Sequence, residues 1–516
     1  MKVRKLGGGA GKIAASLNSE SHGRIMGSGI FSLVAKRTSG LSWLTLTFTI
    51  GFAIFATGCG GAGGGGTTLK GNTAVVLLAT STANDQLSQF PIALKSLTLT
   101  SRSGTTVTLI SSPLSAEFIH LNGNLEPLTT VSIPEDVYTS ATAVEGGTAP
   151  VCIGLESSSG GLLVDGAMNG PGTQPITVNL PQPITVSGEA MGLVLNLQVS
   201  QSAPFSGSCA PNLEVAVAPV FALTPMAIAA QPTNSTNGKA IGLEGLIGSV
   251  NAGGDGFAVT APVGYWNGYP PTWQVAVNGN RDFEGVGNSA GLSAGMPVDM
   301  DVALQADGSL LATRVAVYDT NTSNLSFSSG QITLESPSKS EVYGLTAQVA
   351  GDLPAMSDIF GYSDAAFGTS GQFTNVPSLP FAAVFNAGSI AGGQNILVNA
   401  NAAPVEGLPP LPLPVATITL MPQTLNGTVS AISPQGAFTA YTITLAPYDL
   451  FPVLSALPAQ ATLLSSPGTV TVYADSSTQM LSAPAVSGVF RFYGLVFNDN
   501  GTLKMDCAQV SVGVAE

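Results

Sequence analysis

Glycine and proline break this sequence into short segments more strongly than any other feature. The 516 residues include 62 glycines and 34 prolines, and both residue types interrupt regular elements and favour turns. Between them, apolar and polar residues alternate, as in 92–100 and 105–110. Such alternation places successive side chains on opposite faces of a strand. The pattern predicts an all-β protein of many short strands, and it excludes a coiled coil, a collagen-like fibre and a disordered acidic tail.

Charged residues are scarce and unevenly placed. Asp, Glu, Lys and Arg make up 9% of the chain and the net charge is −14, whereas a typical soluble domain has about 25% charged residues. Residues 1–58 hold seven basic side chains against Glu20 alone, so the remainder is even more acidic than the whole. An acidic body repels phosphate backbones, which argues against nucleic acid as a partner.

Residues 1–58 have the order of a secretory signal peptide. Basic residues come first, an apolar run follows over 41–56, and small residues lead to Cys59. The run is shorter than the roughly 20 residues that a membrane-spanning helix needs. An uncleaved anchor helix is the alternative, and translation could start at Met1 or at Met26.

The stretch Ala56-Thr57-Gly58-Cys59 resembles the bacterial lipobox. In that family the cysteine receives lipid and becomes the mature N-terminus, so the resemblance implies lipidation at Cys59 and a membrane partner through this lipid. Residue Gly60 is not the aspartate that retains such lipoproteins at the inner membrane. We therefore expect an outer-membrane lipoprotein of the cell envelope, whose body faces the periplasm or the cell surface.

Three cysteines remain beyond the lipidation site. Export permits disulfides, and Cys152 and Cys209 fall in the same predicted domain, while Cys507 lies about 300 residues further on. The simplest assignment is one bridge between Cys152 and Cys209, with Cys507 a buried free thiol. Connectivity cannot be deduced from the sequence alone.

Turn-rich linkers and repeated patterns divide the chain into seven segments. We expect an N-terminal antiparallel β-sandwich followed by about three small β-barrel-like repeats, the second of them degenerate. The expected segments are the signal peptide 1–58, the tether 59–72, the sandwich 73–230, a linker 231–240, and barrel repeats 241–320, 330–421 and 422–516. Within the sandwich the expected strands include 73–78, 92–100, 105–110, 175–180, 183–186, 193–199 and 213–219.

Two stretches of the sandwich carry a family resemblance. Residues 117–123 end in Leu-Asn-Gly, and residues 131–139 read Val-Ser-Ile-Pro-Glu-Asp-Val-Tyr-Thr. Together they resemble the bacterial domain-of-unknown-function family 4382, in which a strand ending in Leu-Asn-Gly precedes a Pro-x-Gly-x-Tyr turn. Asp136 stands here where that family has glycine. The resemblance implies an exported β-sandwich module without an established activity.

The C-terminal half contains an internal repeat. Gly245-Leu-Ile-Gly-Ser-Val250 parallels Gly427-Thr-Val-Ser-Ala-Ile432, and the turns Asp307-Gly308 and Asn500-Gly501 recur near the end of each unit. Asp-Gly and Asn-Gly between strands are strong hairpin signals. The pattern resembles domain-of-unknown-function family 5666, which implies small β-barrel-like units over roughly 240–516.

Few residues qualify for catalysis or metal binding. His22 lies in the signal peptide, so His120 is the only histidine beyond it, and multi-histidine metal sites are excluded. We expect His120 to be a hydrogen-bonded strand residue. Asp299 and Asp301 share one strand face; we expect a solvated face, with a calcium site or an acid/base pair as the alternative.

The aromatic residues are the most distinctive candidates. Both tryptophans beyond the signal peptide, Trp266 and Trp273, fall in one short window with Tyr265 and Tyr269. Asn-Gly and Pro-Pro within the window predict a surface loop. Aromatic faces stack on sugars and anchor protein interfaces, so these four residues are the candidate ligand-binding site. The alternative is that both indoles fold inward and fill the end of their barrel.

The sequence therefore predicts a lipid-anchored binding or structural protein without catalytic residues, metal or cofactor. Its expected partners are the membrane and either a polysaccharide or another envelope protein. The alternative from a different class is a polysaccharide-active enzyme that uses paired carboxylates such as Asp299 and Asp301.

Overall fold

The structure of the chain is a computed structural model that is almost entirely β. It describes residues 69–82, 87–148, 151–156, 162–167, 176–203, 217–228, 238–266, 270–279, 282–305, 307–320, 326–336, 341–350, 358–363, 365–370, 378–400, 413–447, 449–456 and 463–514. The all-β class expected from the sequence is confirmed.

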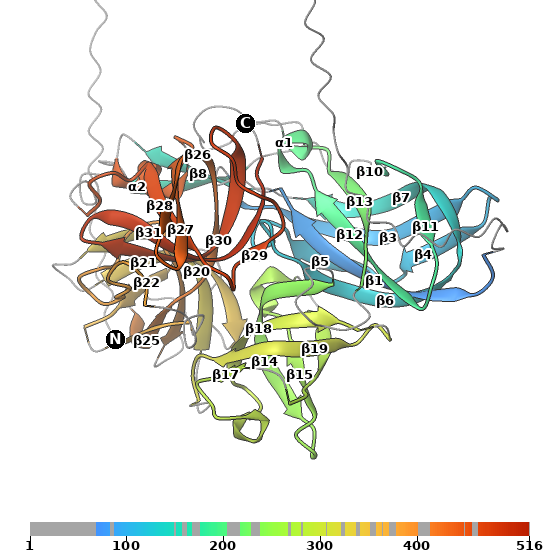
Figure 1. Cartoon of the computed structure of the whole chain (residues 1–516), viewed down its shortest axis with the longest axis horizontal. Helices are drawn as coiled ribbons and strands as arrows, with labels where there is room; N and C mark the ends of the chain where they lie inside the picture. The colour runs from blue at the N-terminus through green and yellow to red at the C-terminus, as the bar shows by residue number, and fades with distance from the viewer. Residues whose placement is uncertain are drawn as a thin grey trace, which may run out of the picture. The chain divides into compact units, whose positions relative to one another are not determined.

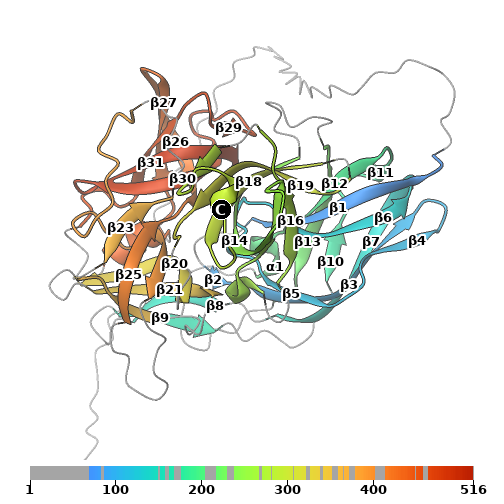
Figure 2. The ribbon, with the colours of Figure 1, turned by 90° about the horizontal axis from the view of Figure 1, so that it is seen from below.

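Two sheets form the N-terminal β-sandwich (Figures 1 and 2, blue to green). The first has the order β10 (Thr177–Asn179), β13 (Val220–Met226), β12 (Ala190–Leu197), β1 (Asn72–Ser81) and β6 (Glu126–Pro134). The second has the order β11 (Ile184–Val186), β7 (Asp136–Thr148), β3 (Pro91–Ser101) and β4 (Thr106–Ile110), with β5 (Leu114–Glu117) also paired to β3.

The sandwich differs from the expected antiparallel arrangement in two pairings. Strand β1 pairs with β12 in parallel, and β10 pairs with β13 in parallel. The first sheet is mixed because β12 runs beside β1 in the same direction, whereas β6 runs along the other edge of β1 in the opposite direction. Most of the strand expected at 213–219 lies outside the described residues. Its described part, 217–219, is not a strand, and β13 begins after Pro219, which has no N–H for the ladder.

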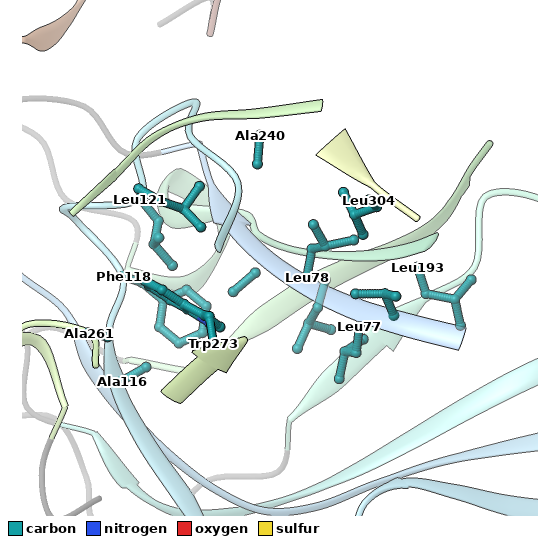
Figure 3. Packing of buried hydrophobic residues seen from close by; sticks show 14 of the residues in the cluster. Leu77, Leu78, Ala116, Phe118, Leu121, Leu193, Ala240, Ala261, Trp273 and Leu304 are labelled. Carbon is teal, nitrogen blue, oxygen red and sulfur yellow. The ribbon is translucent and has the colours of Figure 1, made fainter. Parts of the chain in front are cut away.

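Strand β1 is the centre of the largest hydrophobic core. Its residues from Val75 to Ala79 are all buried, as expected of a central strand covered on both faces. Figure 3 shows Leu77 and Leu78 in the same cluster as Ala240 and Leu304, which belong to the next module. The sandwich core therefore continues into the first barrel.

A third, smaller sheet lies in the same part of the chain. It has the order β2 (Leu87–Gln89), β8 (Val151–Glu156) and β9 (Leu162–Ala167). One helical turn, α1 (Val199–Ser202), follows β12. No helix among the described residues is long and apolar enough to cross a membrane.

The rest of the chain forms three six-stranded sheets with one common strand order, called barrels 1, 2 and 3 (Figure 1, green through yellow to red). Barrel 1 contains β14 (Lys239–Val250), β15 (Gly256–Thr260), β16 (Thr272–Ala276), β17 (Asp282–Glu284), β18 (Pro297–Leu304) and β19 (Leu310–Val317), with 3-10 turns η2 (Val263–Tyr265) and η3 (Ser289–Gly291). Barrel 2 contains β20 (Ser326–Ser336), β21 (Glu341–Ala350), β22 (Asp358–Gly361), β23 (Ala366–Thr369), β24 (Asn395–Ala400) and β25 (Leu413–Leu420). Barrel 3 contains β26 (Gln423–Gln435), β27 (Phe438–Leu445), α2 (Leu450–Ser455), β28 (Thr469–Ala474), β29 (Gln479–Met480), β30 (Val489–Asp499) and β31 (Thr502–Val512).

Each of these sheets closes on itself. The third and last strands pair in parallel, β16 with β19, β22 with β25, and β28 with β31. The short strands β17, β23 and β29 pair with a further part of the same last strand. Closure satisfies the outer backbone groups that an open sheet would leave exposed.

The hairpins expected at the end of the first and last units are confirmed. Asp307-Gly308 joins the antiparallel strands β18 and β19, and Asn500-Gly501 joins β30 and β31. Gly308, Asn500 and Gly501 all have positive φ, which asparagine and glycine tolerate better than other residues.

One turn recurs in all three barrels. The first strand of each barrel has a bulge, at Gly248, Thr333 and Ser430. The residue before each bulge accepts a backbone hydrogen bond from a residue with positive φ: Gly295 donates to Ile247 (2.7 Å), Gly393 to Ile332 (2.7 Å) and Ser487 to Val429 (2.8 Å). Only barrel 3 places a residue with a side chain at this position.

We expect Ser487→Gly to stabilise the protein, because a side chain at φ 68° costs roughly 1–2 kcal/mol in the folded state. Glycine offsets only about 0.5–1 kcal/mol of this gain, because it gives the unfolded chain more conformational entropy. The expected gain is about 0.5 kcal/mol, measured by denaturant unfolding. Gly295→Ala, at the matching turn of barrel 1, should instead destabilise by about 1 kcal/mol. Loss of stability in Ser487→Gly would contradict this account.

Candidate functional site

The structure buries the tryptophans of the predicted binding loop. Trp266 is 4% exposed and Trp273 is 6% exposed, while Tyr265 is half-buried and Tyr269 lies outside the described residues. The ligand-binding interpretation of this window needs exposed indoles, which the structure does not show at these two positions. Their burial agrees with the alternative, in which both rings belong to the core.

Both indole N–H groups bind the sandwich. Trp266 Nε1 donates to Glu126 Oε1 (3.2 Å), and Trp273 Nε1 donates to the carbonyl oxygen of Pro127 (2.9 Å). A buried indole N–H needs an acceptor, and strand β6 of the sandwich supplies both acceptors. Figure 3 shows Trp273 of barrel 1 beside Phe118 of the sandwich. The aromatic window thus joins two modules.

His120 lies at the centre of this contact. Its Nδ1 is 3.1 Å from Glu117 Oε2 and its Nε2 is 2.9 Å from Glu126 Oε2. The Tyr265 ring stacks on the imidazole, with centroids 4.0 Å apart and planes 1° apart. His120 is hydrogen-bonded as expected, but it occupies a turn after β5 and not a strand.

The two glutamates hold His120 in its charged form. Burial alone would lower the pKa of His120, but the hydrogen bonds and negative charges of Glu117 and Glu126 outweigh it and raise this pKa to about 9. Burial opposes ionisation of Glu117, yet its bonds with His120 and the backbone N–H of Phe90 keep its pKa below the usual value. A histidine that titrates near 9 is poorly matched to general acid/base work near neutral pH.

The predicted carboxylate pair forms a charged cluster with Arg314. Arg314 Nη2 donates to Asp299 Oδ2 (2.6 Å), and Arg314 Nε donates to Asp301 Oδ2 (3.0 Å). Asp301 Oδ1 also accepts the backbone N–H of Gly242 (3.1 Å). Asp299 is completely buried, so the expectation of a solvated strand face is wrong at this position.

Tyrosines of two modules surround this cluster. Tyr318 follows β19, and Tyr493 belongs to β30 of barrel 3. Gly242 has a φ of 70°, and a Cβ there would collide with the Tyr493 hydroxyl. Burial, with nearby acidic groups, raises the pKa of both tyrosines well above their usual value. The cluster therefore lies on the outer face of barrel 1, where this barrel contacts barrel 3.

Burial dominates the electrostatics of Asp299. Desolvation raises the pKa of Asp299, Arg314 opposes the rise, and Asp301 adds to it. The two aspartates together hold the pKa of Arg314 well above its usual value despite burial. A glycosidase needs two carboxylates that face a substrate across a cleft. Here both carboxylates converge on one guanidinium, which is an arrangement for holding barrel 1 together and against its neighbour.

The cysteine predictions are only partly within the described residues. Cys59 and Cys209 lie outside them, and Cys152 is described only by its backbone in β8, so the Cys152–Cys209 bridge and lipidation at Cys59 stay predictions. Cys507 is a buried free thiol, as expected. Its Sγ donates to the carbonyl oxygen of Gln509 (3.3 Å), and burial raises its pKa.

Metal sites can be assessed for the described part of the chain. Within it, no group of three or more His, Cys, Asp or Glu side chains could hold a metal ion. Asp499, in the Asn-Asp-Asn-Gly turn, binds Lys504 Nζ through a contact of 2.6 Å.

A second junction was not expected from the sequence. Arg491 of β30 donates from Nη1 to the carbonyl oxygen of Ser81 (2.9 Å), and Thr424 Oγ1 donates to that of Asn122 (2.6 Å). Burial lowers the pKa of Arg491 to about 10. The Leu-Asn-Gly turn, noted only for its family resemblance, is thus the sandwich's contact with barrel 3.

In comparisons with known proteins, no family model, curated protein or solved structure matches this chain. The resemblances to families 4382 and 5666 stay predictions.

We expect stability to fall with rising pH because of His120. Its pKa is about 9 when folded and about 6.5 when unfolded, so its contribution is complete below pH 6.5 and is lost as pH rises through 9. The upper bound is about 3 kcal/mol. Denaturant unfolding of the wild type and of His120→Gln should differ most at pH 6 and converge by pH 10.

Asp506 also makes stability fall with pH, since burial and Asp475 raise its pKa to about 7, but that loss is nearly complete before pH 8. Burial also raises the pKa of Cys507, Tyr318 and Tyr493, so these groups lower stability above pH 8 in both proteins. The difference in slope between the wild type and His120→Gln from pH 8 to pH 10 therefore reports His120. An equal slope in the wild type and His120→Gln over this interval would disprove the assignment.

We expect Arg314→Met to destabilise the protein by about 3–5 kcal/mol, because it leaves two carboxylates without their counter-charge. Arg102→Met, at an exposed arginine, should cost less than about 0.5 kcal/mol. Adding Asp299→Asn and Asp301→Asn to Arg314→Met should recover part of the loss. Equal unfolding free energies for Arg314→Met and Arg102→Met would show that the cluster is not structural.

Proposed function

We propose that the chain is a lipid-anchored protein of the bacterial cell envelope that acts as a non-catalytic binding or structural module. The observation that best supports this proposal is the position of its buried and partly buried charged side chains. Glu126 with His120, Arg314 with its aspartates, and Arg491 all lie where one module meets another. Because these charged side chains hold the modules together, they favour a structural or binding protein over an enzyme that turns over a substrate.

The anchor part of the proposal rests on the N-terminal sequence. A basic segment, the apolar run over 41–56 and the lipobox-like stretch before Cys59 favour export and lipidation. Gly60 favours the outer membrane over the inner. The proposed partners are the membrane through the lipid, and a polysaccharide or another envelope protein through the body.

The body supports a display role through its surface charge. Its acidity opposes binding to nucleic acid and to other strongly acidic surfaces, and closed barrels expose little unpaired strand edge. The resemblance to family 4382 points in the same direction, since its members are exported β-sandwich modules. We infer no reaction for this chain.

We expect Cys59→Ser to abolish lipid attachment, because only the thiol can receive the lipid, and each buried acyl CH₂ adds about 0.8 kcal/mol to membrane binding. The measurement is incorporation of labelled palmitate together with fractionation of cell membranes. The variant should lose the label and remain unprocessed or leave the membrane fraction.

Cys507→Ser is the matched control, since Cys507 is a buried thiol in the body and its loss should leave labelling unchanged. Normal N-terminal cleavage, labelling and fractionation of Cys59→Ser would remove the lipoprotein proposal.

A further inference from the structure

The three barrels allow an internal comparison of the same barrel end. Three residues after the shared positive-φ turn, β18, β24 and β30 each pair with the last strand of their barrel. The paired residues are Val298 with Val317 in barrel 1, Ile396 with Leu420 in barrel 2, and Phe490 with Val512 in barrel 3.

These equivalent positions differ sharply in exposure. Val317 is 7% exposed and Leu420 is 0% exposed, but Val512 is 65% exposed. Phe490 is also only half-buried, whereas Val298 and Ile396 are buried. Barrel 3 therefore leaves uncovered an apolar end that its two sister barrels bury.

The loop before the fifth strand explains the difference. In barrel 1 it spans 285–296 and buries Leu292 and Met296 in the same core as Val317. In barrel 2 its described part, 378–394, buries Phe385 and Ile390 with Leu420. In barrel 3 it is only 481–488, the shortest of the three, and its two large apolar residues, Leu481 and Val486, are exposed.

The uncovered end gathers most of the exposed apolar side chains. Five of the eight large hydrophobic residues that are exposed in the described chain belong to barrel 3: Ile432, Met480, Leu481, Val486 and Val512. Met480 and Leu481 are joined to Val510 by strand pairing and by a backbone hydrogen bond. Ile432 pairs with Tyr441, whose ring contacts Phe492 inside the barrel. A grouped set of this kind marks an interaction surface, whereas scattered ones do not.

The lack of charged residues at this end indicates which kind of surface can bind to it. Residues 429–445, 476–490 and 507–514, which build it, contain no Asp, Glu, Lys or Arg. The chain as a whole has a net charge of −14, so two copies repel one another over most of their surface. They can meet without like-charge contacts at this face, beside which Arg491 donates from Nε to the carbonyl oxygen of Val512 (3.0 Å).

We propose that this end of barrel 3, defined by Ile432, Leu481, Val486, Phe490 and Val512, is the contact between two copies of this chain. A two-fold contact brings the same patch from both copies together, and an uncharged apolar patch is complementary to itself. In such a pair, side chains of one copy cover the barrel end of the other, as Leu292 and Phe385 do within their own barrels. The proposal goes beyond the display role above and does not depend on lipidation.

The test is photo-cross-linking of the full chain in intact cells. Two differently tagged copies are co-expressed, each with Val512→p-benzoylphenylalanine, and irradiated. We expect an adduct of twice the chain's mass that carries both tags. Val144→p-benzoylphenylalanine is the control, since Val144 is 52% exposed on the sandwich, and it should give no doubly tagged adduct.

A second variant checks the apolar character of the contact. Val486→Glu, in chains that keep the cross-linker at position 512, should reduce the doubly tagged adduct at least tenfold, while the thermal transition of the protein stays unchanged because Val486 is exposed. Absence of any adduct at position 512, an adduct with a different protein, or full cross-linking in Val486→Glu would each overturn the proposal.

Discussion

Closure of the three barrels is the constraint on which the rest of the structure depends. Strand β16 pairs with β15 along one edge, and its parallel pairing with β19 along the other edge turns an open sheet into a closed one. Closure requires the strands to bend, and the bulges at Gly248, Thr333 and Ser430 supply the bend. Once the strands are closed, the barrels can pack side by side through their outer faces, because few backbone groups remain unpaired there.

Some of the few charged residues of the chain lie at the contacts between these modules. Only four arginines follow residue 58, namely Arg102, Arg281, Arg314 and Arg491, and two of them, Arg314 and Arg491, lie partly buried at module junctions. Arg314 neutralises two aspartates on barrel 1, and Arg491 binds backbone oxygens of the sandwich. A buried ion cluster contributes little net stability but makes wrong packing costly, because each charge needs its partner. We infer that these junctions select one arrangement of the modules.

Much of the local structure was predictable, and the exceptions are informative. The strands 92–100 and 105–110 and the hairpins at Asp307-Gly308 and Asn500-Gly501 follow from alternation and turn chemistry, which act over a few residues. The first strand of barrel 2 was not among the predicted repeats, because Gly330-Gln331-Ile332 differs from the Gly-Leu-Ile and Gly-Thr-Val of the other two units. The bulge at Thr333 shows that this strand is equivalent to the first strands of barrels 1 and 3. Parallel pairings such as β1 with β12 carry no local signal, since the partners lie more than a hundred residues apart.

The all-β class, the hairpins, the apolar run that precedes Cys59 and the shortage of histidine can be read from residue type and short-range order alone. The roles of the candidate site residues depend instead on how the modules pack together. Trp266 and Trp273 turn inward because β6 offers acceptors for their N–H groups. Asp299 is buried because Arg314 binds it from the neighbouring strand β19 and Tyr493 of barrel 3 packs nearby. The direction of a side chain at a module boundary depends on partners far along the chain, and no local pattern encodes it.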